Sequence, residues 1–320
     1  MRSSESEVIV IALGGNVLMR EGELGTFEEQ LRHIQSVAKQ VVDLIESGFM
    51  IALTHGNGPQ VGATLMRHRL AKGIFPALPL HACNAETQGL IGYMIEQTVQ
   101  DEINRRNIKI CVTTIITRVL VDENDPAFQN PNKPVGKVFH EWEEHEWRDA
   151  LEDKTNVVIK KVPAGNGYRL VVPSPTPLLI VEHRAIQRLI EAGFLVIACG
   201  GGGIPVIEKK GVKIGVNAVI DKDLASERLA TLIGATRLVL LTNIDGVYEN
   251  FGKGNQRLLL NIRVKELNNI SAEWLGEGSM APKVKASTAF IKNGGKEAII
   301  AHLDKLSDAV AGHSGTHILP

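Results

Sequence analysis

Two lysines stand where the sequence predicts the first turns of helices, and this position suggests that they meet an anion. Lys222 follows Asp221, whose side chain suits the N-cap of a helix. Lys283 follows Pro282, a residue favoured at the first helical position. The helix dipole disfavours a cation at this end unless an anion binds, so both lysines are candidate ligands of a charged group. Asp223 could orient both, although a solvated charge or a first-turn acid would account for each of these residues taken alone.

Three glycine-rich turns, each after a predicted strand, extend this idea to phosphate. They are Gly14-Gly15-Asn16, Gly56-Asn57-Gly58 and Gly200–Gly203. In an open α/β sheet, ligands bind outside the carboxyl ends of the strands. Glycine there lets backbone N–H groups approach a phosphate, and a helix N-terminus adds positive potential. One such turn would mean little because tight strand–helix connections need glycine, but three in one chain favour a phosphorylated ligand.

A fourth turn and the histidines give weaker functional signals than the three glycine-rich turns. Asp245, in Asn243-Ile244-Asp245-Gly246, could contact a nucleotide or could simply form the turn. His140 and His145 imitate a zinc motif, but a spacing of five places them on different faces of a helix, so the sequence predicts no metal site there. The isolated histidines are expected to be structural, namely His55 and His81.

Buried apolar runs alternate with amphipathic stretches, and this alternation predicts an α/β fold on a parallel sheet. Strands are predicted at Val8–Leu13, Phe49–Thr54, Phe194–Cys199, Leu238–Leu241 and Ala298–Ala301. Helices are predicted from about Leu31 to Gly48 and at about 84–106, 182–192, 222–233 and 283–293. Tyr93 and Met94, in the second of these helices, are expected to be core residues.

The alternation breaks between about residues 122 and 177, where prolines mark both ends. A hairpin is predicted inside this segment, with strands Val157–Val162 and Tyr168–Val172 around a Gly165-Asn166-Gly167 turn. We therefore predict one α/β domain over residues 1–320, with a small, lid-like subdomain inserted at about 122–177. The alternative is a long surface loop, which is uncommon at this length.

Charge and cysteine content exclude several classes of protein. The 320 residues carry 35 basic and 36 acidic side chains, a net charge of −1, and only 4% are aromatic. This composition disfavours binding to nucleic acid or to an anionic membrane. The three cysteines are Cys83, Cys111 and Cys199, which lie far apart in the sequence and form no CxxC pair. A zinc ribbon or redox dithiol is therefore not expected, and a reducing compartment fits best.

Common nucleotide and hydrolase motifs are absent, since the sequence contains no GxxxxGK[ST], no strict GxGxxG, no protein-kinase HRD or DFG set and no GxSxG. The apolar run near the N-terminus is too short for a signal-peptide core, and no run approaches the roughly 20 residues that span a bilayer. We therefore expect a soluble, cytoplasmic protein.

Eight motifs follow one another along essentially the whole chain: Ala12–Asn16, His55–Gly62, Thr87–Gly89, Asn130–Gly136, Val172–Pro175, Cys199–Val206, Ile220–Asp223 and Gly278–Lys283. Taken together and in this order, they resemble the motifs of carbamate kinases, a branch of the amino-acid kinase superfamily. The resemblance implies an open three-layer αβα sandwich with a mainly parallel central sheet and a small protruding subdomain. It also implies a homodimer and the reaction ATP + carbamate ⇌ ADP + carbamoyl phosphate with Mg²⁺, often run toward ATP in arginine metabolism.

One departure from the wider superfamily favours this branch. Many members carry a catalytic lysine in a K-x-G-G turn on the first strand, where this sequence has Ala12. Carbamate kinases also lack it, and a lysine on the protruding subdomain takes its place. Lys133 matches that position, while nearby Lys137 departs from the uncharged residue expected there and is a second candidate.

The resemblance also implies roles for particular residues. Lys222 and Lys133 would contact the transferring phosphoryl and carbamoyl groups, Lys283 would hold nucleotide phosphates, and Asp223 would set the lysine geometry. The remaining candidates contact substrate phosphates (Gly14, Gly15, Asn16, Gly56, Asn57, Gly58, Gly201, Gly202, Asp221) or the nucleotide (Thr242, Asn243, Asp245, Tyr248, Met280). Mg²⁺ would be held by phosphates and water, because no carboxylate cage is visible in the sequence.

Two other functions remain open from the sequence. The chain could be another small-molecule kinase of the same superfamily, or a nucleotide sensor without catalysis on the same fold. Three placed lysines weigh against the sensor, since binding alone does not require stabilising a transferring phosphoryl group.

Overall fold

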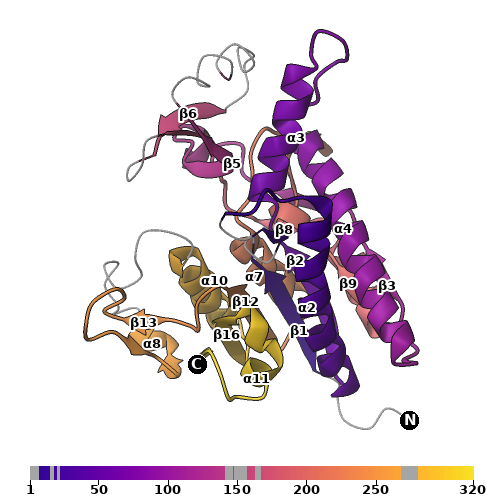
Figure 1. Cartoon of the computed structure of the whole chain (residues 1–320), viewed down its shortest axis with the longest axis vertical. Helices are drawn as coiled ribbons and strands as arrows, with labels where there is room; N and C mark the ends of the chain where they lie inside the picture. The colour runs from indigo at the N-terminus through magenta and orange to yellow at the C-terminus, as the bar shows by residue number, and fades with distance from the viewer. Residues whose placement is uncertain are drawn as a thin grey trace.

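The apolar runs of the sequence form the middle layer of the computed structural model, an eight-stranded sheet (Figure 1). The structure describes residues 7–14, 18–19, 22–140, 147, 157–162, 167–267 and 280–320. The strand order is β15-β17-β16-β12-β1-β2-β9-β3, and every neighbouring pair is parallel except β16 with β17. The strands span Val8–Leu13 (β1), Met50–His55 (β2), Val112–Thr114 (β3), Leu195–Ile197 (β9), Arg237–Thr242 (β12), Asn261–Arg263 (β15), Glu297–His302 (β16) and Thr316–Leu319 (β17).

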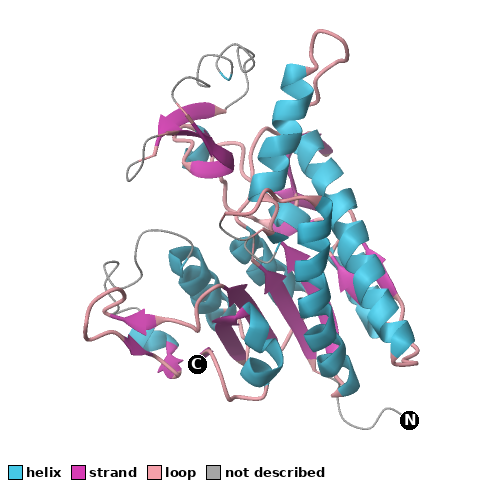
Figure 2. Ribbon diagram, in the orientation of Figure 1, coloured by secondary structure: helices cyan, strands magenta, loops and turns pink. Residues whose placement is uncertain are grey.

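Helices cover both faces of this sheet, which confirms the predicted three-layer αβα sandwich (Figure 2). Successive side chains of β1 point to opposite faces. Val10 and Ala12 therefore pack with one set of helices, and Ile9 and Ile11 pack with the other. The first set is α6 (His183–Glu191), α7 (Lys222–Leu232) and α10 (Met280–Lys292), and the second is α2 (Phe27–Glu46), α4 (Leu80–Arg105) and α11 (Leu306–Val310).

Besides the central sheet and the two-stranded sheet of β13 (Tyr248–Glu249) and β14 (Arg257–Leu258), the described residues form two smaller sheets. One has the order β11-β10-β4-β8, with β4 (Arg118–Leu120), β8 (Leu179–Ile180), β10 (Ile204–Lys209) and β11 (Val212–Gly215). The other is the antiparallel sheet β5-β7-β6, with β5 (Lys133–Phe139), β6 (Val158–Lys161) and β7 (Tyr168–Val172). The pairing of β6 with β7 confirms the predicted hairpin strands, while Gly165 and Asn166 of its turn lie outside the described residues.

The β5-β7-β6 sheet packs on α3 (Gly58–Leu70), beside which it stands in Figure 1. Phe139 stacks on Trp147 at 4.7 Å, and both belong to an apolar cluster that includes Val61 and Leu65 of α3. The closest crossing is between Gly62 of α3 and Gly136 of β5, where a Cβ on Gly62 would collide with the backbone of Gly136. Two glycines thus let a helix and a strand touch through their backbones.

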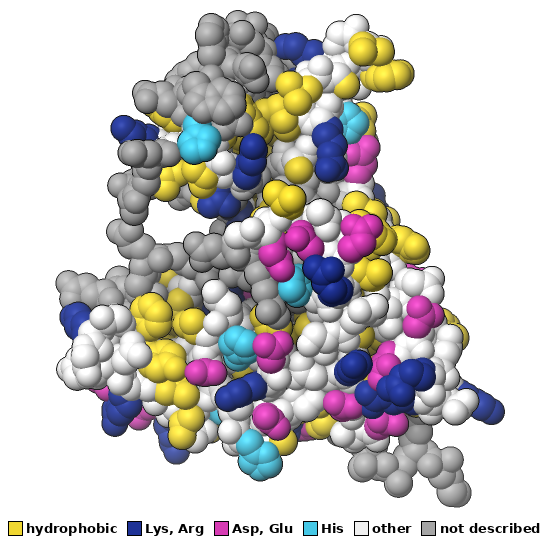
Figure 3. Space-filling view, viewed as in Figure 1, with side chains coloured by type: hydrophobic (Ala, Val, Ile, Leu, Met, Phe, Trp, Pro, Cys, Tyr) yellow, Lys and Arg dark blue, Asp and Glu magenta, His cyan; other side chains and the backbone are white. Residues whose placement is uncertain are grey.

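The remaining described elements are short: η1 (Pro126–Phe128), η3 (Gly200–Gly202), β13 (Tyr248–Glu249), β14 (Arg257–Leu258), α8 (Val264–Leu267) and η4 (Leu303–Lys305). On the face shown in Figure 3, basic and acidic side chains are interspersed over the described surface, in keeping with the net charge of −1. No helix among the described residues is long and apolar enough to cross a membrane.

Several predicted elements need correction. Helix α3 was not among the predicted helices. Pro59 occupies its first turn, and Val61 and Leu65 bury its apolar face. Helices α4 and α10 begin earlier than predicted, at Leu80 and Met280. Tyr93 is 56% exposed and is not a core residue, whereas Met94 is buried as expected. Neighbouring helical residues point about 100° apart, so burial of one does not imply burial of the other.

Candidate active site

A cavity of about 290 Å³ lies where the glycine turns after β1, β2 and β9 meet the first turns of α7 and α10. The β5-β7-β6 sheet contributes to the same cavity through β5 and β7. The cavity thus brings together residues from both ends of the chain, as the carboxyl-end rule for parallel sheets predicts. Its lining includes Gly14, Gly56, Asn57, Gly58, Lys133, Arg169, Gly201, Asp221, Lys222, Asp223, Thr242 and Lys283.

Asp223 lies between two of the lysines. Lys222 Nζ donates to its Oδ1 at 2.5 Å, and Lys283 Nζ donates to its Oδ2 at 3.1 Å. Asp223 and Lys283 are each only 3% exposed. The predicted orienting role of Asp223 therefore has the necessary geometry. One carboxylate neutralises only one of two ammonium groups, so this cluster retains a positive charge that faces the cavity.

Electrostatics make this cluster receptive to an anion. Burial lowers the pKa of Lys283, the nearby charge of Lys222 lowers it further, and Asp223 opposes both effects. The charged form of Lys283 is thus disfavoured by its surroundings, and an anion in the cavity would favour it.

Lys133 reaches the same cavity from β5. Its Nζ donates to Asp221 Oδ2 at 2.7 Å, across 88 residues of sequence. The other oxygen of Asp221 accepts from the backbone N–H of Asp223 at 2.9 Å, which confirms Asp221 as the N-cap of α7. Burial alone would raise the pKa of Asp221, but Lys133, Lys222 and the cap hydrogen bond lower it to about 2. The second candidate lysine, Lys137, is exposed and does not line the cavity.

The turn after β2 is held from behind by α4. Asn57 is 2% exposed, and its Nδ2 donates to Asn84 Oδ1 at 2.5 Å and to Thr87 Oγ1 at 2.7 Å. The Asn57 amide is thus used to fix the turn, while Gly56 and Gly58 line the cavity. Of the first turn only Gly14 is described and lines the cavity; Gly15 and Asn16 lie outside the described residues.

The third glycine turn is packed too tightly for side chains. Gly201 has φ +63°, and a Cβ there would collide with the amide of Asn57. Gly202 has φ +86°, and a Cβ there would collide with the carbonyl oxygen of Ile220. Gly201 lines the cavity, whereas Gly202 is buried and is absent from its lining. These glycines bring the turn after β9 against both the β2 turn and the start of α7.

Of the residues predicted to contact the nucleotide, only Thr242 is in the lining of the cavity. Thr242 lines the cavity beside the lysine cluster, and Met280 is buried at the start of α10. Asn243 is exposed. Tyr248 directs its hydroxyl toward Asp245 Oδ2 at 3.4 Å, and neither residue lines the cavity. The nucleotide assignment of Asn243, Asp245, Tyr248 and Met280 therefore stays a prediction.

Arg169 is a lining residue that the sequence did not single out. Its Nη2 donates to the carbonyl oxygen of Gly136 at 3.1 Å, while its buried Nε has no hydrogen-bond partner among the described residues. Burial also lowers its pKa. It lies within a strand with no motif around it, and only the packing of the β5-β7-β6 sheet brings it to the cavity, so nothing in the sequence could have identified it.

His55 is buried beside the cavity. Burial lowers its pKa to about 4, against a raising effect from its contact with the Gly56 carbonyl oxygen, and the charge of Lys222 lowers it further. His55 is therefore neutral at pH 7. A Cβ on Gly200 would collide with its ring. This packing agrees with the structural role predicted for it.

Comparisons with known proteins agree on one family. The model of the amino acid kinase family matches residues 7–302. The chain is 46% identical over 317 residues to a carbamate kinase of Pyrococcus horikoshii, which covers 98% of this chain and 99% of the relative. It is 44% identical to a carbamate kinase of Clostridium perfringens over 97% of this chain and 99% of the relative. A solved structure of carbamate kinase from Giardia lamblia bound to AMP-PNP matches with a TM-score of 0.89 and 38% identity, covering 98% of each chain.

Proposed function

The chain belongs to the amino acid kinase family, among its carbamate kinases, and we propose that it transfers a phosphoryl group reversibly between ATP and carbamate, giving ADP and carbamoyl phosphate. One observation carries the chemistry of this proposal. The carboxylate of Asp223 holds Lys222 and Lys283 together, within a cavity ringed by glycine turns. Phosphoryl transfer places negative charge on the oxygens of the moving group, and a preorganised set of cations stabilises that charge.

The reaction balances without a general base. An anionic oxygen of carbamate forms the new bond to the γ-phosphorus, and the bond from this phosphorus to the bridging oxygen of ADP breaks. Carbamate needs no proton removed before it attacks. The two carboxylates in the described lining, Asp221 and Asp223, are each paired with lysine, as this chemistry allows.

The positions of the lysines support a division of labour. Lys222 and Lys133 would stabilise the transferring phosphoryl group and the carbamoyl side, since they lie on facing elements, α7 and β5. Lys283 would hold the nucleotide phosphates, next to Thr242. The turns at Gly14 and Gly56–Gly58, together with Gly201, would supply backbone donors to substrate oxygens.

The nucleotide would enter as its Mg²⁺ complex. The donor set of the cavity fits an ion carried by phosphates, because Asp221 and Asp223 are already committed to lysines and offer no open carboxylate cage. Mg²⁺ would neutralise charge on the phosphate oxygens. The likeness to the AMP-PNP complex of the Giardia lamblia enzyme supports a nucleotide site in this chain.

We also propose that the chain forms a homodimer, acts in the cytoplasm and serves arginine metabolism by making ATP from carbamoyl phosphate. Tyr93 and Ile116, which are 56% and 46% exposed, line one surface depression and offer apolar area for a dimer contact. The inserted subdomain at about 122–177 would act as a lid, because it carries Lys133 on a sheet of its own. Light scattering of the purified chain tests the dimer.

The decisive experiment measures ATP formed from ADP, Mg²⁺ and carbamoyl phosphate in a coupled assay. Wild-type protein should form ATP, and Lys222→Ala should lower turnover by about 10²–10³-fold, the usual effect of losing one group that stabilises a transition state. Lys285→Ala, on an exposed position of α10, is the matched control and should leave turnover unchanged. A folded, ADP-binding protein without activity would favour another superfamily substrate. Failure with acetylglutamate, aspartate and fosfomycin as well would favour the nucleotide sensor.

A further inference from the structure

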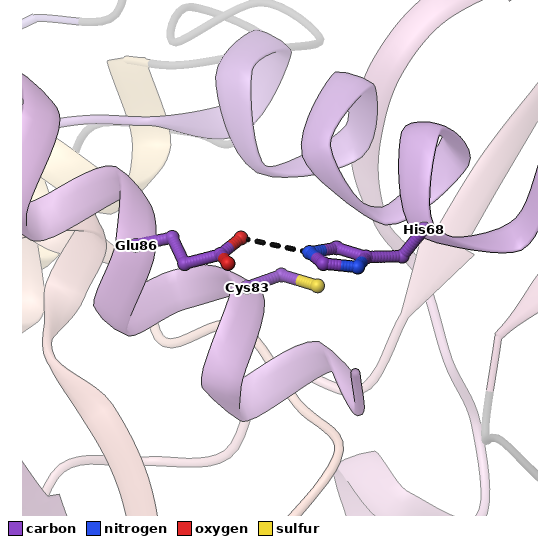
Figure 4. A group of neighbouring side chains, drawn as sticks. All are labelled: His68, Cys83 and Glu86. Atoms are coloured by element: carbon purple, nitrogen blue, oxygen red, sulfur yellow. Dashed lines mark hydrogen bonds and ion pairs between the residues drawn. The ribbon is translucent and has the colours of Figure 1, made fainter. Parts of the chain in front are cut away.

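A second group of chemically active side chains lies outside the cavity, between α3 and α4 (Figure 4). His68 comes from the last turn of α3, and Cys83 and Glu86 come from the start of α4. One ligand atom of each, an imidazole nitrogen, the Sγ and a carboxylate oxygen, lies within 4.8 Å of the other two. Cys83 and Glu86 are three residues apart on one helix and therefore share a face.

These three groups form a donor set that suits a borderline-soft divalent cation. Imidazole, thiolate and carboxylate are the protein ligands of Zn²⁺, which bind at about 2.0–2.3 Å. Tetrahedral geometry with those bonds places ligand atoms roughly 3.3–3.8 Å apart. The three ligand atoms here lie up to 4.8 Å apart, slightly farther than in a bound site. His68 Nε2 and Glu86 Oε2 are closer than in such a site, at 2.9 Å, and would move apart to admit the ion. Side-chain rotation suffices, because the side chains of His68 and Glu86 are 25% and 45% exposed.

The surroundings of these three residues fix the position of the Cys83 Sγ and provide negative charge for the cation. Cys83 is fully buried in the apolar cluster that joins α3, α4 and the β5-β7-β6 sheet, so its Sγ is held in place. A thiolate and a carboxylate together would neutralise the two charges of Zn²⁺. Burial and the charge of Glu86 raise the pKa of the Cys83 thiol to about 11, and the nearby charge of Arg69 opposes this only in part. The ion would therefore bind by displacing the thiol proton to solvent, as zinc does at cysteine ligands.

We propose that His68, Cys83 and Glu86 bind Zn²⁺, or a similar divalent cation such as Co²⁺, with water completing the coordination. The ion would clip the last turn of α3 to the first turns of α4. Helix α3 begins at the Gly56–Gly58 turn, and Asn84 and Thr87 of α4 hold Asn57 within that turn. The clip would therefore brace the frame behind the cavity without touching the reacting groups.

The test uses the full-length protein, first stripped of metal with a chelator, and Co²⁺ as a spectroscopic probe. Wild-type protein should bind one equivalent with a sulfur-to-cobalt charge-transfer band, and Zn²⁺ should abolish this band by competition. His68→Gln changes a partly exposed side chain and Glu86→Gln an exposed one, so we expect both variants to fold. Each should weaken binding by more than the roughly 10–100-fold that follows loss of an outer-sphere partner. Cys83→Ser should remove the band, whereas Cys111→Ser, at an exposed cysteine outside the group, should keep it.

Thermal unfolding gives an independent readout. Zn²⁺ should raise the Tm of the wild type and of Cys111→Ser, but not that of His68→Gln. A missing charge-transfer band, a band that survives Cys83→Ser, or equal Zn²⁺ affinity in wild type and His68→Gln would overturn the proposal. Binding at the catalytic cavity cannot imitate the expected result, because no cysteine lies in its described lining.

Discussion

Asp223→Asn most directly tests whether the charge of Asp223 holds the two lysines of the cavity in place. It keeps the size of the side chain but removes the negative charge that forms ion pairs with both Lys222 and Lys283. At an effective dielectric constant of about 20, a unit charge pair 3.1 Å apart is worth roughly 5 kcal/mol. Breaking a buried pair by removing one partner costs about 3–5 kcal/mol in practice.

The cost should fall near the lower end, about 3 kcal/mol, for a reason visible in the structure. Burial and Lys222 already lower the pKa of Lys283. Without Asp223, Lys283 can release its proton, so that no buried ammonium group remains beside Lys222 without this carboxylate. The free energy of unfolding, measured with urea at pH 7, should therefore fall by about 3 kcal/mol, and turnover in the coupled assay should fall by about 10²–10³-fold.

Sulfate provides the contrast that separates this mechanism from simple damage to the fold. Sulfate should stabilise Asp223→Asn more than the wild type, because an anion restores the missing charge between two lysines. Asp101→Asn, at an exposed position of α4, is the control and should change neither stability nor turnover. An Asp223→Asn protein with unfolding free energy within about 1 kcal/mol of wild type and near-normal turnover would refute the argument.

Three further predictions follow from the same geometry. Lys133→Ala should cut turnover by about 10²–10³-fold and Lys137→Ala should leave it nearly unchanged, since only the first lines the cavity; the reverse ranking in the coupled assay would show that the wrong lysine was assigned. The pKa of Asp221 is lowered on folding from 3.8 to about 2, so its stabilisation is present above pH 4 and is lost as the pH falls toward 2. Asp221→Asn should therefore flatten the acid limb of urea-unfolding stability by about 2 kcal/mol, and an unchanged acid limb would contradict the lowered pKa. Gly201→Ala should lower the free energy of unfolding by at least about 1–3 kcal/mol, because Gly201 has a positive φ and an added Cβ would collide with Asn57. Gly254→Ala, where an added Cβ meets no other atom, is the control and should unfold at the same midpoint urea concentration as the wild type.

The parts of the site that depend on local sequence could be predicted. Asp221 and Lys222 belong to one helix start, so the cap and the place of the lysine follow from neighbouring residues. The strands were recognisable because a sheet covered on both faces needs continuous apolar runs, such as Val8–Leu13.

What escaped prediction depends on contacts between distant segments. The ion pair of Lys133 with Asp221 spans 88 residues, and only a family resemblance pointed to that lysine. Arg169 reaches the cavity because a separate sheet packs on α3, which no periodicity in its strand reveals. Tyr93 was misplaced because helical pattern alone does not tell which side of α4 faces the core.

The crossing of Gly62 and Gly136 affects how a substitution at position 62 should be interpreted. Neither glycine lines the cavity, yet the crossing fixes how closely the strand bearing Lys133 approaches α3, the helix that starts at the Gly56–Gly58 turn. One added methyl group at position 62 would wedge these two backbones apart. Because positioning errors of about 1 Å cost such reactions about a hundredfold, a variant that looks like a packing defect there would behave in an assay as a loss of catalysis.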